Sequence, residues 1–166
     1  MVVFTGAHVG VYDVDPVAVF EAATRPERLD RWIIGEFENV RVNGGGPFTS
    51  GTRFLADEAL AERSREMDHL YEVIEYEPAQ VFAVRCIDGP RYVGELRLRA
   101  QDGQTRVSWT YSVAPSGRFD RVMCLLLYAK TQRNSARHAE RQVRKLVAIA
   151  KDLSQPGVDG HAAEGD

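Results

Sequence analysis

The sequence predicts an α+β fold in which a curved, seven-stranded antiparallel sheet wraps round one long C-terminal helix. Apolar residues recur at every second position through much of residues 36–113, which is typical of strands that bury one face. Two short helical patterns follow an initial strand, and a long helical pattern occupies residues 119–153. We therefore expect one strand, two short helices, six strands and one long helix, in that order.

The composition is that of one globular domain. The chain has 166 residues, of which 44% are hydrophobic and 27% charged, and its net charge of -3 argues against nucleic acid or an anionic membrane as its main partner. No apolar run approaches the roughly 20 residues of a membrane span, and the first residues do not resemble a signal peptide. We expect a cytoplasmic monomer or homodimer, with one domain over residues 1–153 and a disordered Gly- and Pro-containing tail over 154–166.

The first elements are defined by alternation and by proline. "AHVGVYDV" alternates as a strand does, and in "DPVAVFEAAT" Asp15 can cap a helix whose first turn holds Pro16. "RPERLDRW" restarts after Pro26 as a second short helix that ends near Trp32. A strand followed by two short helices in series is a distinctive opening.

Six further strands follow, and one hairpin sets part of their register. The predicted strands are 36–43, 51–58, 65–76, 80–87, 92–100 and 105–113. Asp102-Gly103 is a strong signal for a two-residue type I′ turn. Opposed residues share a face of the sheet. The turn therefore predicts three inward-facing pairs: Leu98 with Val107, Leu96 with Trp109, and Gly94 with Tyr111.

The neighbouring strands extend this inner face. A three-residue "DGP" loop places Cys86 opposite Tyr92, and an even-length connection through "EPAQ" sets Tyr71 against Cys86 and Val73 against Val84. His69 and Tyr71 then face inward. A loop one residue longer would turn all of these side chains to the other face.

The last helix is small or polar at its centre. The face that begins at Leu125 reads Leu125, Tyr128, Gln132, Ser135, Ala139, Gln142, Leu146, Ile149 and Leu153. A curved sheet cannot contact a straight helix along its full length, so such residues suit a stretch that bridges a hollow. We predict a cavity between sheet and helix, to which Gly94 adds room from the sheet side.

The order of these segments resembles the SRPBCC or START-like helix-grip superfamily. The resemblance covers residues 4–153 and is carried by "DVDPVAVFEAATRPERLDRW", "SGTRF", "YEVIEYEPAQVFAV", "DGQTRVSWTYSV" and "QRNSARHAERQVRKLVAIAKDL". It implies a deep, mostly apolar pocket that binds a small hydrophobic or aromatic molecule. In the polyketide cyclase/dehydrase type it also implies cyclisation or dehydration by proton transfer, without metal or cofactor.

The candidate site residues face the predicted cavity. His69 and Tyr71 are the candidates for acid–base catalysis, the alternative being a partly exposed, hydrogen-bonded histidine near a strand end. The predicted ligand-binding residues are Trp32, Phe54, Tyr92, Trp109, Tyr111, Tyr128, Gln132 and Ser135. Aromatic residues of a pocket and of an ordinary core give the same pattern, so both interpretations stay open.

No sequence motif predicts a metal, a cofactor or a phosphate. The four histidines are far apart, no HxxxH or CxxC spacing is present, and Cys86 and Cys124 are expected to be reduced and buried, with a disulfide as the alternative. Three hypotheses for function remain. The chain is a cofactor-free enzyme, a non-catalytic carrier for a lipid or hydrophobic metabolite, or a regulator that binds a partner in the same groove.

Overall fold

The computed structural model describes residues 3–33, 38–42, 46–57, 68–89, 91–114 and 128–154, without the side chains of 38, 57, 68 and 128–133. The elements, in chain order, are β1 (Phe4–Tyr12), α1 (Pro16–Thr24), α2 (Pro26–Trp32), β2 (Glu38–Val42), β3 (Arg53–Asp57), β4 (Asp68–Glu77), β5 (Val81–Cys86), β6 (Arg91–Gln101), β7 (Gln104–Ala114) and α4 (Tyr128–Ser154).

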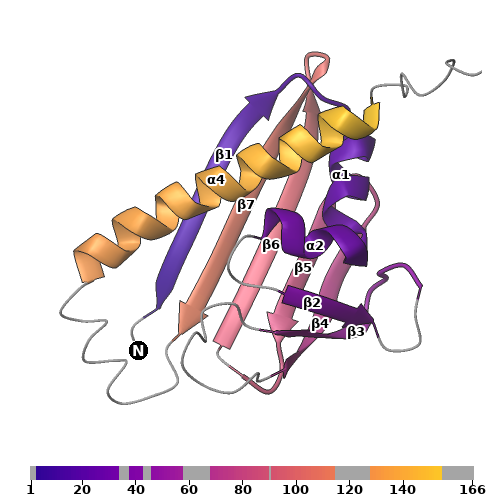
Figure 1. Ribbon diagram of the computed structural model, residues 1–166. Helices are drawn as coiled ribbons and strands as arrows, with labels where there is room; N and C mark the ends of the chain where they lie inside the picture. Colours follow the sequence, from indigo (N-terminus) through magenta and orange to yellow (C-terminus); the bar gives the residue numbers. More distant parts are fainter. Residues whose placement is uncertain are drawn as a thin grey trace, which may run out of the picture.

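The seven strands form one antiparallel sheet with the order β1-β7-β6-β5-β4-β3-β2. The long helix α4 crosses one face of this sheet, and α1 and α2 lie beside it on the same face (Figure 1). This arrangement confirms the predicted helix-grip architecture. None of the helices in the described ranges combines the length and apolar composition that a membrane span requires.

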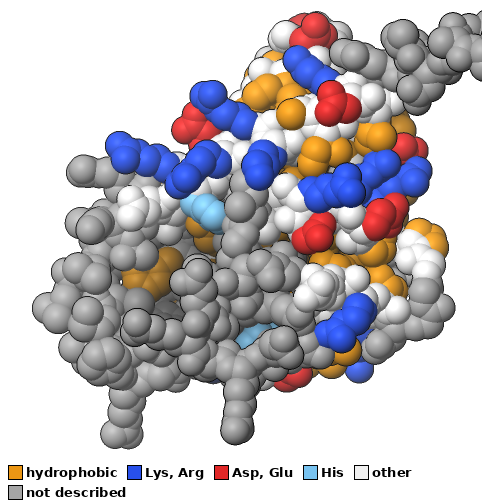
Figure 2. Space-filling view, viewed as in Figure 1, with side chains coloured by type: hydrophobic (Ala, Val, Ile, Leu, Met, Phe, Trp, Pro, Cys, Tyr) orange, Lys and Arg blue, Asp and Glu red, His pale blue; other side chains and the backbone are white. Residues whose placement is uncertain are grey.

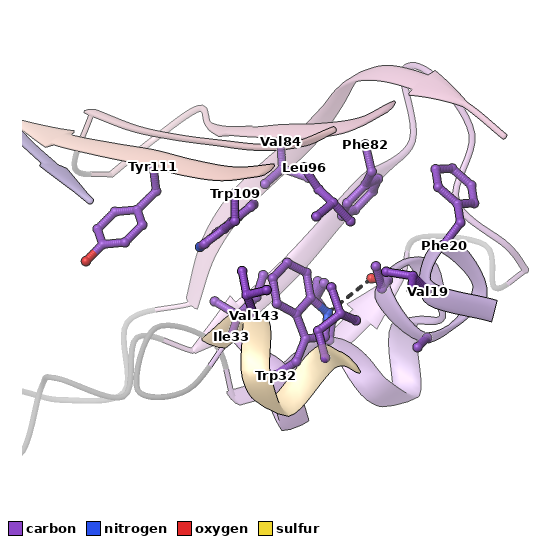
Figure 3. Packing of buried hydrophobic residues seen from close by; sticks show 14 of the residues in the cluster. Val19, Phe20, Trp32, Ile33, Phe82, Val84, Leu96, Trp109, Tyr111 and Val143 are labelled. Carbon is purple, nitrogen blue, oxygen red and sulfur yellow. Dashed lines mark hydrogen bonds between the residues drawn. The ribbon is translucent and has the colours of Figure 1, made fainter. Parts of the chain in front are cut away.

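The two short helices begin where the sequence predicts. The Asp15 carboxylate accepts a hydrogen bond of 2.8 Å from the Val17 amide, and Pro16 occupies the first turn of α1. Pro26 starts α2. The indole N–H of Trp32 donates to the Ala23 carbonyl at 3.3 Å, which ties the end of α2 to α1 and fixes the indole in the core (Figure 3).

The β6–β7 hairpin has the predicted register. Asp102 and Gly103 have φ angles of 50° and 77°, as a type I′ turn requires. The three predicted pairs, Leu98 with Val107, Leu96 with Trp109 and Gly94 with Tyr111, are all present. The inner face of both strands is therefore apolar, as expected.

The β4–β5 pairing matches the prediction for a reason that the sequence does not show. Tyr71 pairs with Cys86 and Val73 with Val84, but Glu77 pairs with Val81, so the loop has three residues, 78–80, in place of the even-length connection expected. A β-bulge between Val73 and Glu75 inserts one extra residue and shifts the register back. The two irregularities cancel, and the predicted inward set is confirmed: His69, Tyr71 and Val73 are buried.

The helix predicted over 119–153 is present as α4 from residue 128 onward, and 119–127 lie outside the described residues. It packs mainly against β1 and α1. Its buried residues are Ala139, Gln142, Val143, Leu146, Val147 and Ala150. Its opposite face is rich in Arg and Lys (Figure 2). Ala139 and Gln142, near the middle of the predicted stripe, are fully buried, so the small and polar residues do face the interior.

Candidate functional site

A series of aromatic rings runs along the inner face. Consecutive ring centroids lie 4.9 Å (Trp32–Trp109), 6.3 Å (Trp109–Tyr111), 6.4 Å (Tyr111–Tyr92), 6.2 Å (Tyr92–Tyr71) and 5.4 Å (Tyr71–Phe54) apart. All six rings come from residues that the sequence singles out. The structure thus brings together side chains that β3, β4, β6, β7 and α2 supply from distant parts of the chain.

The first part of this face, which we call the hydrocarbon half, consists of Trp32, Phe48, Phe54, Phe82 and Trp109. None of these side chains is more than 1% exposed. Phe48 lies 5.1 Å from Phe54 and 5.6 Å from Phe82, centroid to centroid. Trp32 and Trp109 meet edge to face between sheet and helices (Figure 3). These rings pack as a core does, which favours the core interpretation for Trp32 and Phe54.

The second part, the tyrosine half, consists of Tyr71, Tyr92 and Tyr111, which are 2%, 5% and 6% exposed. Two glycines make room for these rings. A Cβ on Gly94 would lie 2.8 Å from the Tyr92 hydroxyl, and a Cβ on Gly6 of β1 would overlap the Tyr111 ring. Gly94 was expected to add space here. The contribution of Gly6 was not expected, because the register that pairs Gly6 of β1 with Tyr111 of β7 cannot be inferred from the sequence.

Helix α4 contributes polar groups to the tyrosine half. The Tyr111 hydroxyl donates to the Ser135 carbonyl at 3.3 Å, and the His138 ring meets Tyr111 edge-on at 6.1 Å. Ser135, a predicted ligand-binding residue, is half-buried here. The side chains of Tyr128 and Gln132, predicted for the same role, lie outside the described residues.

Gln142 of α4 is a site residue that the sequence analysis placed on the inner stripe but did not select. Its side chain is fully buried, and its Oε1 accepts the indole N–H of Trp109 at 2.8 Å. Because an indole nitrogen can only donate, this bond fixes the orientation of the amide. The Nε2 group then points elsewhere and has no hydrogen-bond partner among the described residues. A buried donor left unpaired costs about 1–3 kcal/mol.

His69 lies at one end of the inner face, beside Tyr71. It is 8% exposed, so it is buried and not partly exposed as the alternative had it. Its Nδ1 is 3.7 Å from Oδ1 of Asp88, which also accepts the Leu70 amide at 2.7 Å. Ligand atoms of His69, Cys86 and Asp88 all lie within 4.8 Å of one another. No sequence spacing indicates this cluster, since strand pairing creates it.

Two clefts in the described chain lie outside this inner face. One of about 560 Å³ is lined by Glu21, Thr24, Arg25, Pro26, Glu27, Val42, Gly46, Pro47 and Tyr76. Another of about 300 Å³ lies on the outer face of β6 and β7, at Arg97, Arg99, Arg106 and Ser108. The ring of Tyr76 packs on Phe20 at 5.1 Å and on Phe82 at 6.4 Å, which separates the larger cleft from the core. The cavity under α4 stays a prediction.

The sequence matches one family model along most of its length. The model describes polyketide cyclases/dehydrases and lipid transport proteins, and the match covers residues 8–147. The chain belongs to this family. The order of the sequence segments resembles the polyketide cyclase/dehydrase type of helix-grip protein, and the family match confirms that resemblance. No functionally curated protein matches the sequence.

Solved structures support the same fold for this family member. TTHA0849 from Thermus thermophilus superposes with a TM-score of 0.66 and 17% identity, over 91% of this chain and 99% of that one. SA2116 from Staphylococcus aureus, a protein of unknown function, superposes with a TM-score of 0.66 and 11% identity, over 93% of this chain and 98% of that one. Norcoclaurine synthase from Thalictrum flavum, in complex with dopamine and hydroxybenzaldehyde, superposes with a TM-score of 0.57 and 11% identity, over 92% of this chain and 87% of that one. Identities this low show a shared fold and no more.

Proposed function

We propose that this protein binds a small, mostly apolar aromatic molecule between α4 and the tyrosine half, through a hydrogen-bond acceptor such as a carbonyl oxygen. The observation that carries the proposal is the unpaired Nε2 donor of Gln142. Trp109 holds the amide in this orientation, so a ligand that enters under α4 would meet a donor that is already oriented and lacks a partner among the described residues.

The surroundings of Gln142 support an aromatic ligand. Tyr111 lies 6.3 Å from Trp109, so the next rings along the inner face are phenols, which offer flat apolar surfaces together with hydroxyl groups. The similar norcoclaurine synthase holds dopamine and hydroxybenzaldehyde, which are both phenols. This likeness supports the ligand class and does not identify the ligand.

A matched pair of probes tests the proposal. 2-Acetylnaphthalene carries a carbonyl oxygen, and 2-ethylnaphthalene has nearly the same shape without it. A net hydrogen bond contributes about 1 kcal/mol, so the ketone should bind roughly fivefold more tightly. Gln142→Leu should abolish this preference. The exposed Gln101→Leu serves as the control, and quenching of the two tryptophans, Trp32 and Trp109, reports binding.

Two results would count against the proposal. The first is that neither probe binds to the protein, and the second is that Gln142→Leu still binds the ketone more tightly than 2-ethylnaphthalene. Because Gln142→Leu also removes the acceptor of the Trp109 indole, the melting temperature of each variant should be measured alongside the affinity.

A second candidate function is proton-transfer catalysis on the bound molecule, without a cofactor. It is favoured by the Asp88 carboxylate, whose Oδ1 lies 3.7 Å from Nδ1 of His69 and could orient an imidazole that acts as a base, and by Tyr71 beside it. Native mass spectrometry of protein purified from its own cells would identify a co-purified compound to test for conversion. In an enzyme, His69→Gln and Tyr71→Phe should abolish turnover and retain affinity. In a carrier, no turnover is present to lose.

A further inference from the structure

We propose that His69, Cys86 and Asp88 form a binding site for a divalent transition-metal ion of the Zn²⁺ type. The inference does not rest on the proposed function, because metal binding can be measured without any small molecule. One imidazole nitrogen, one thiol sulfur and one carboxylate oxygen lie within 4.8 Å of one another. Ligand atoms round tetrahedral zinc are roughly 3.3–3.8 Å apart, given the usual bond lengths. His69 Nδ1 and Asp88 Oδ1 are 3.7 Å apart, so a small side-chain adjustment brings this pair to the spacing of about 3.3 Å that a nitrogen and an oxygen have round zinc.

The strand register brings the three ligands together. Tyr71 pairs with Cys86, so two residues further along, His69 comes opposite Asp88. Cys86 and Asp88 are two residues apart and share a face with His69. The β-bulge after Val73 sets this register. Without the bulge, Cys86 would pair with Glu72, and His69 would lie on the other face from Cys86.

The surroundings orient the ligands before any ion binds. The Leu70 amide donates to Asp88 Oδ1 at 2.7 Å, which aims the carboxylate, and such outer partners strengthen metal sites. Gly89 has no side chain, and a Cβ at that position would collide with Nδ1 of His69. The Asp88 side chain is 52% exposed, so an ion can enter from solvent and water can take the fourth position.

The donor set selects the class of metal. A thiolate and an imidazole prefer Zn²⁺ and its neighbours to Mg²⁺ or Ca²⁺, which bind oxygen ligands. Binding requires Cys86 to lose its proton, so affinity should rise with pH. Three protein ligands with one open position are typical of zinc sites that also bind water or substrate.

Cobalt titration of the full chain, without an affinity tag, tests the site. Co²⁺ should give a thiolate charge-transfer band in the near ultraviolet and the visible bands of a tetrahedral ion, and Zn²⁺ should abolish both. Cys86→Ser should remove the charge-transfer band. Asp88→Asn should weaken binding more than about tenfold, since even outer partners of metal ligands contribute 10–100-fold. Cys124→Ser, at the other cysteine, should change neither.

Circular dichroism of each variant separates loss of the site from loss of the fold, and Asp88→Asn alters the most exposed of the three ligands. The proposal fails if stoichiometric Co²⁺ gives no charge-transfer band. It also fails if the band survives in Cys86→Ser. A bound ion would occupy the lone pair that His69 needs as a base. Zn²⁺ should therefore inhibit any turnover that depends on His69, while binding of the naphthyl ketone near Gln142 should continue.

Discussion

The hydrocarbon half and the tyrosine half of the inner face are equally buried and differ in chemistry. The indole and phenyl rings of the first are at most 1% exposed, and the three tyrosines of the second at most 6%. Gln142 bonds to Trp109, next to Tyr111, so its unpaired donor lies where the two halves meet. Burial alone therefore does not separate core from candidate site. The feature that marks the candidate site is a buried polar atom without a partner among the described residues, the Nε2 donor of Gln142.

Truncation in the hydrocarbon half should have the largest effect on stability. Phe82 is 1% exposed and packs on Phe48 and Tyr76, so Phe82→Ala should lower the free energy of unfolding by about 3–5 kcal/mol. Urea denaturation measures the change. Val93→Ala, at a 42% exposed position of the same sheet, is the matched control. A loss below about 1 kcal/mol would mean that this half is not the core that holds the fold together.

A crowding substitution tests whether the tyrosine half is shaped by its glycines. Gly6→Ala places a methyl group against the Tyr111 ring, so it should destabilise the fold by about 1–3 kcal/mol and displace that ring. Weaker binding of 2-acetylnaphthalene should accompany the change. Ala7→Ser, at the next and exposed residue of β1, should alter neither quantity. Unchanged binding in Gly6→Ala would place the ligand away from Tyr111.

Removal of one hydroxyl should cost less than removal of a ring. Tyr111→Phe deletes the donor to the Ser135 carbonyl, which should lower the free energy of unfolding by about 0.5–1.5 kcal/mol. Urea denaturation compares it directly with Phe82→Ala. If the two losses were equal, the halves would not differ in the way that their packing indicates.

The outer face of the same sheet supplies the smallest expected effect. The Arg85 guanidinium hydrogen-bonds to Glu72 and lowers the pKa of that carboxyl below its usual 4.5. Because the pKa of Glu72 is lower in the folded than in the unfolded protein, the ionised carboxylate stabilises the fold at any pH above the pKa of the unfolded protein. This stabilisation is lost as the pH falls through the pKa of the folded protein. Wild type should therefore lose more stability than Glu72→Gln as the pH falls below about 4.5. The difference should be small, because exposed ion pairs contribute little to stability.

Melting temperatures at a series of pH values measure this difference. Glu21→Gln, which removes an exposed carboxylate from α1, is the control. Parallel pH curves for wild type and Glu72→Gln would show that the Arg85 pair does not stabilise the fold.

The fold was predictable because local chemistry sets most of it. Asp102-Gly103 fixes one hairpin, and Asp15 with Pro16 fixes the start of α1. The β4–β5 pairing was predicted correctly only because an odd-length turn and a bulge cancel. No residue pattern in "YEVIEYEPAQ" announces a bulge, so this part of the prediction depended on compensation.

The site was predictable as a set of residue types and not as an arrangement. The inward aromatic residues follow from alternation, and Gln142 is visible as a polar residue on the buried stripe of α4. The orientation of its amide depends on Trp109, 33 residues earlier in the chain. The cluster of His69 with Asp88 depends on register across two strands. Interactions of this kind are properties of the tertiary structure, and no local spacing encodes them.

Nuclear magnetic resonance titration with 2-acetylnaphthalene tests the central claim most directly. We expect the side-chain amide signals of Gln142 and the ring signals of Tyr92 and Tyr111 to shift in a saturable way. The ring signals of Phe48 and Phe82 should stay in place. Equal shifts in both halves, or shifts confined to residues outside the tyrosine half, would contradict the claim that the unpaired Gln142 donor marks the ligand site.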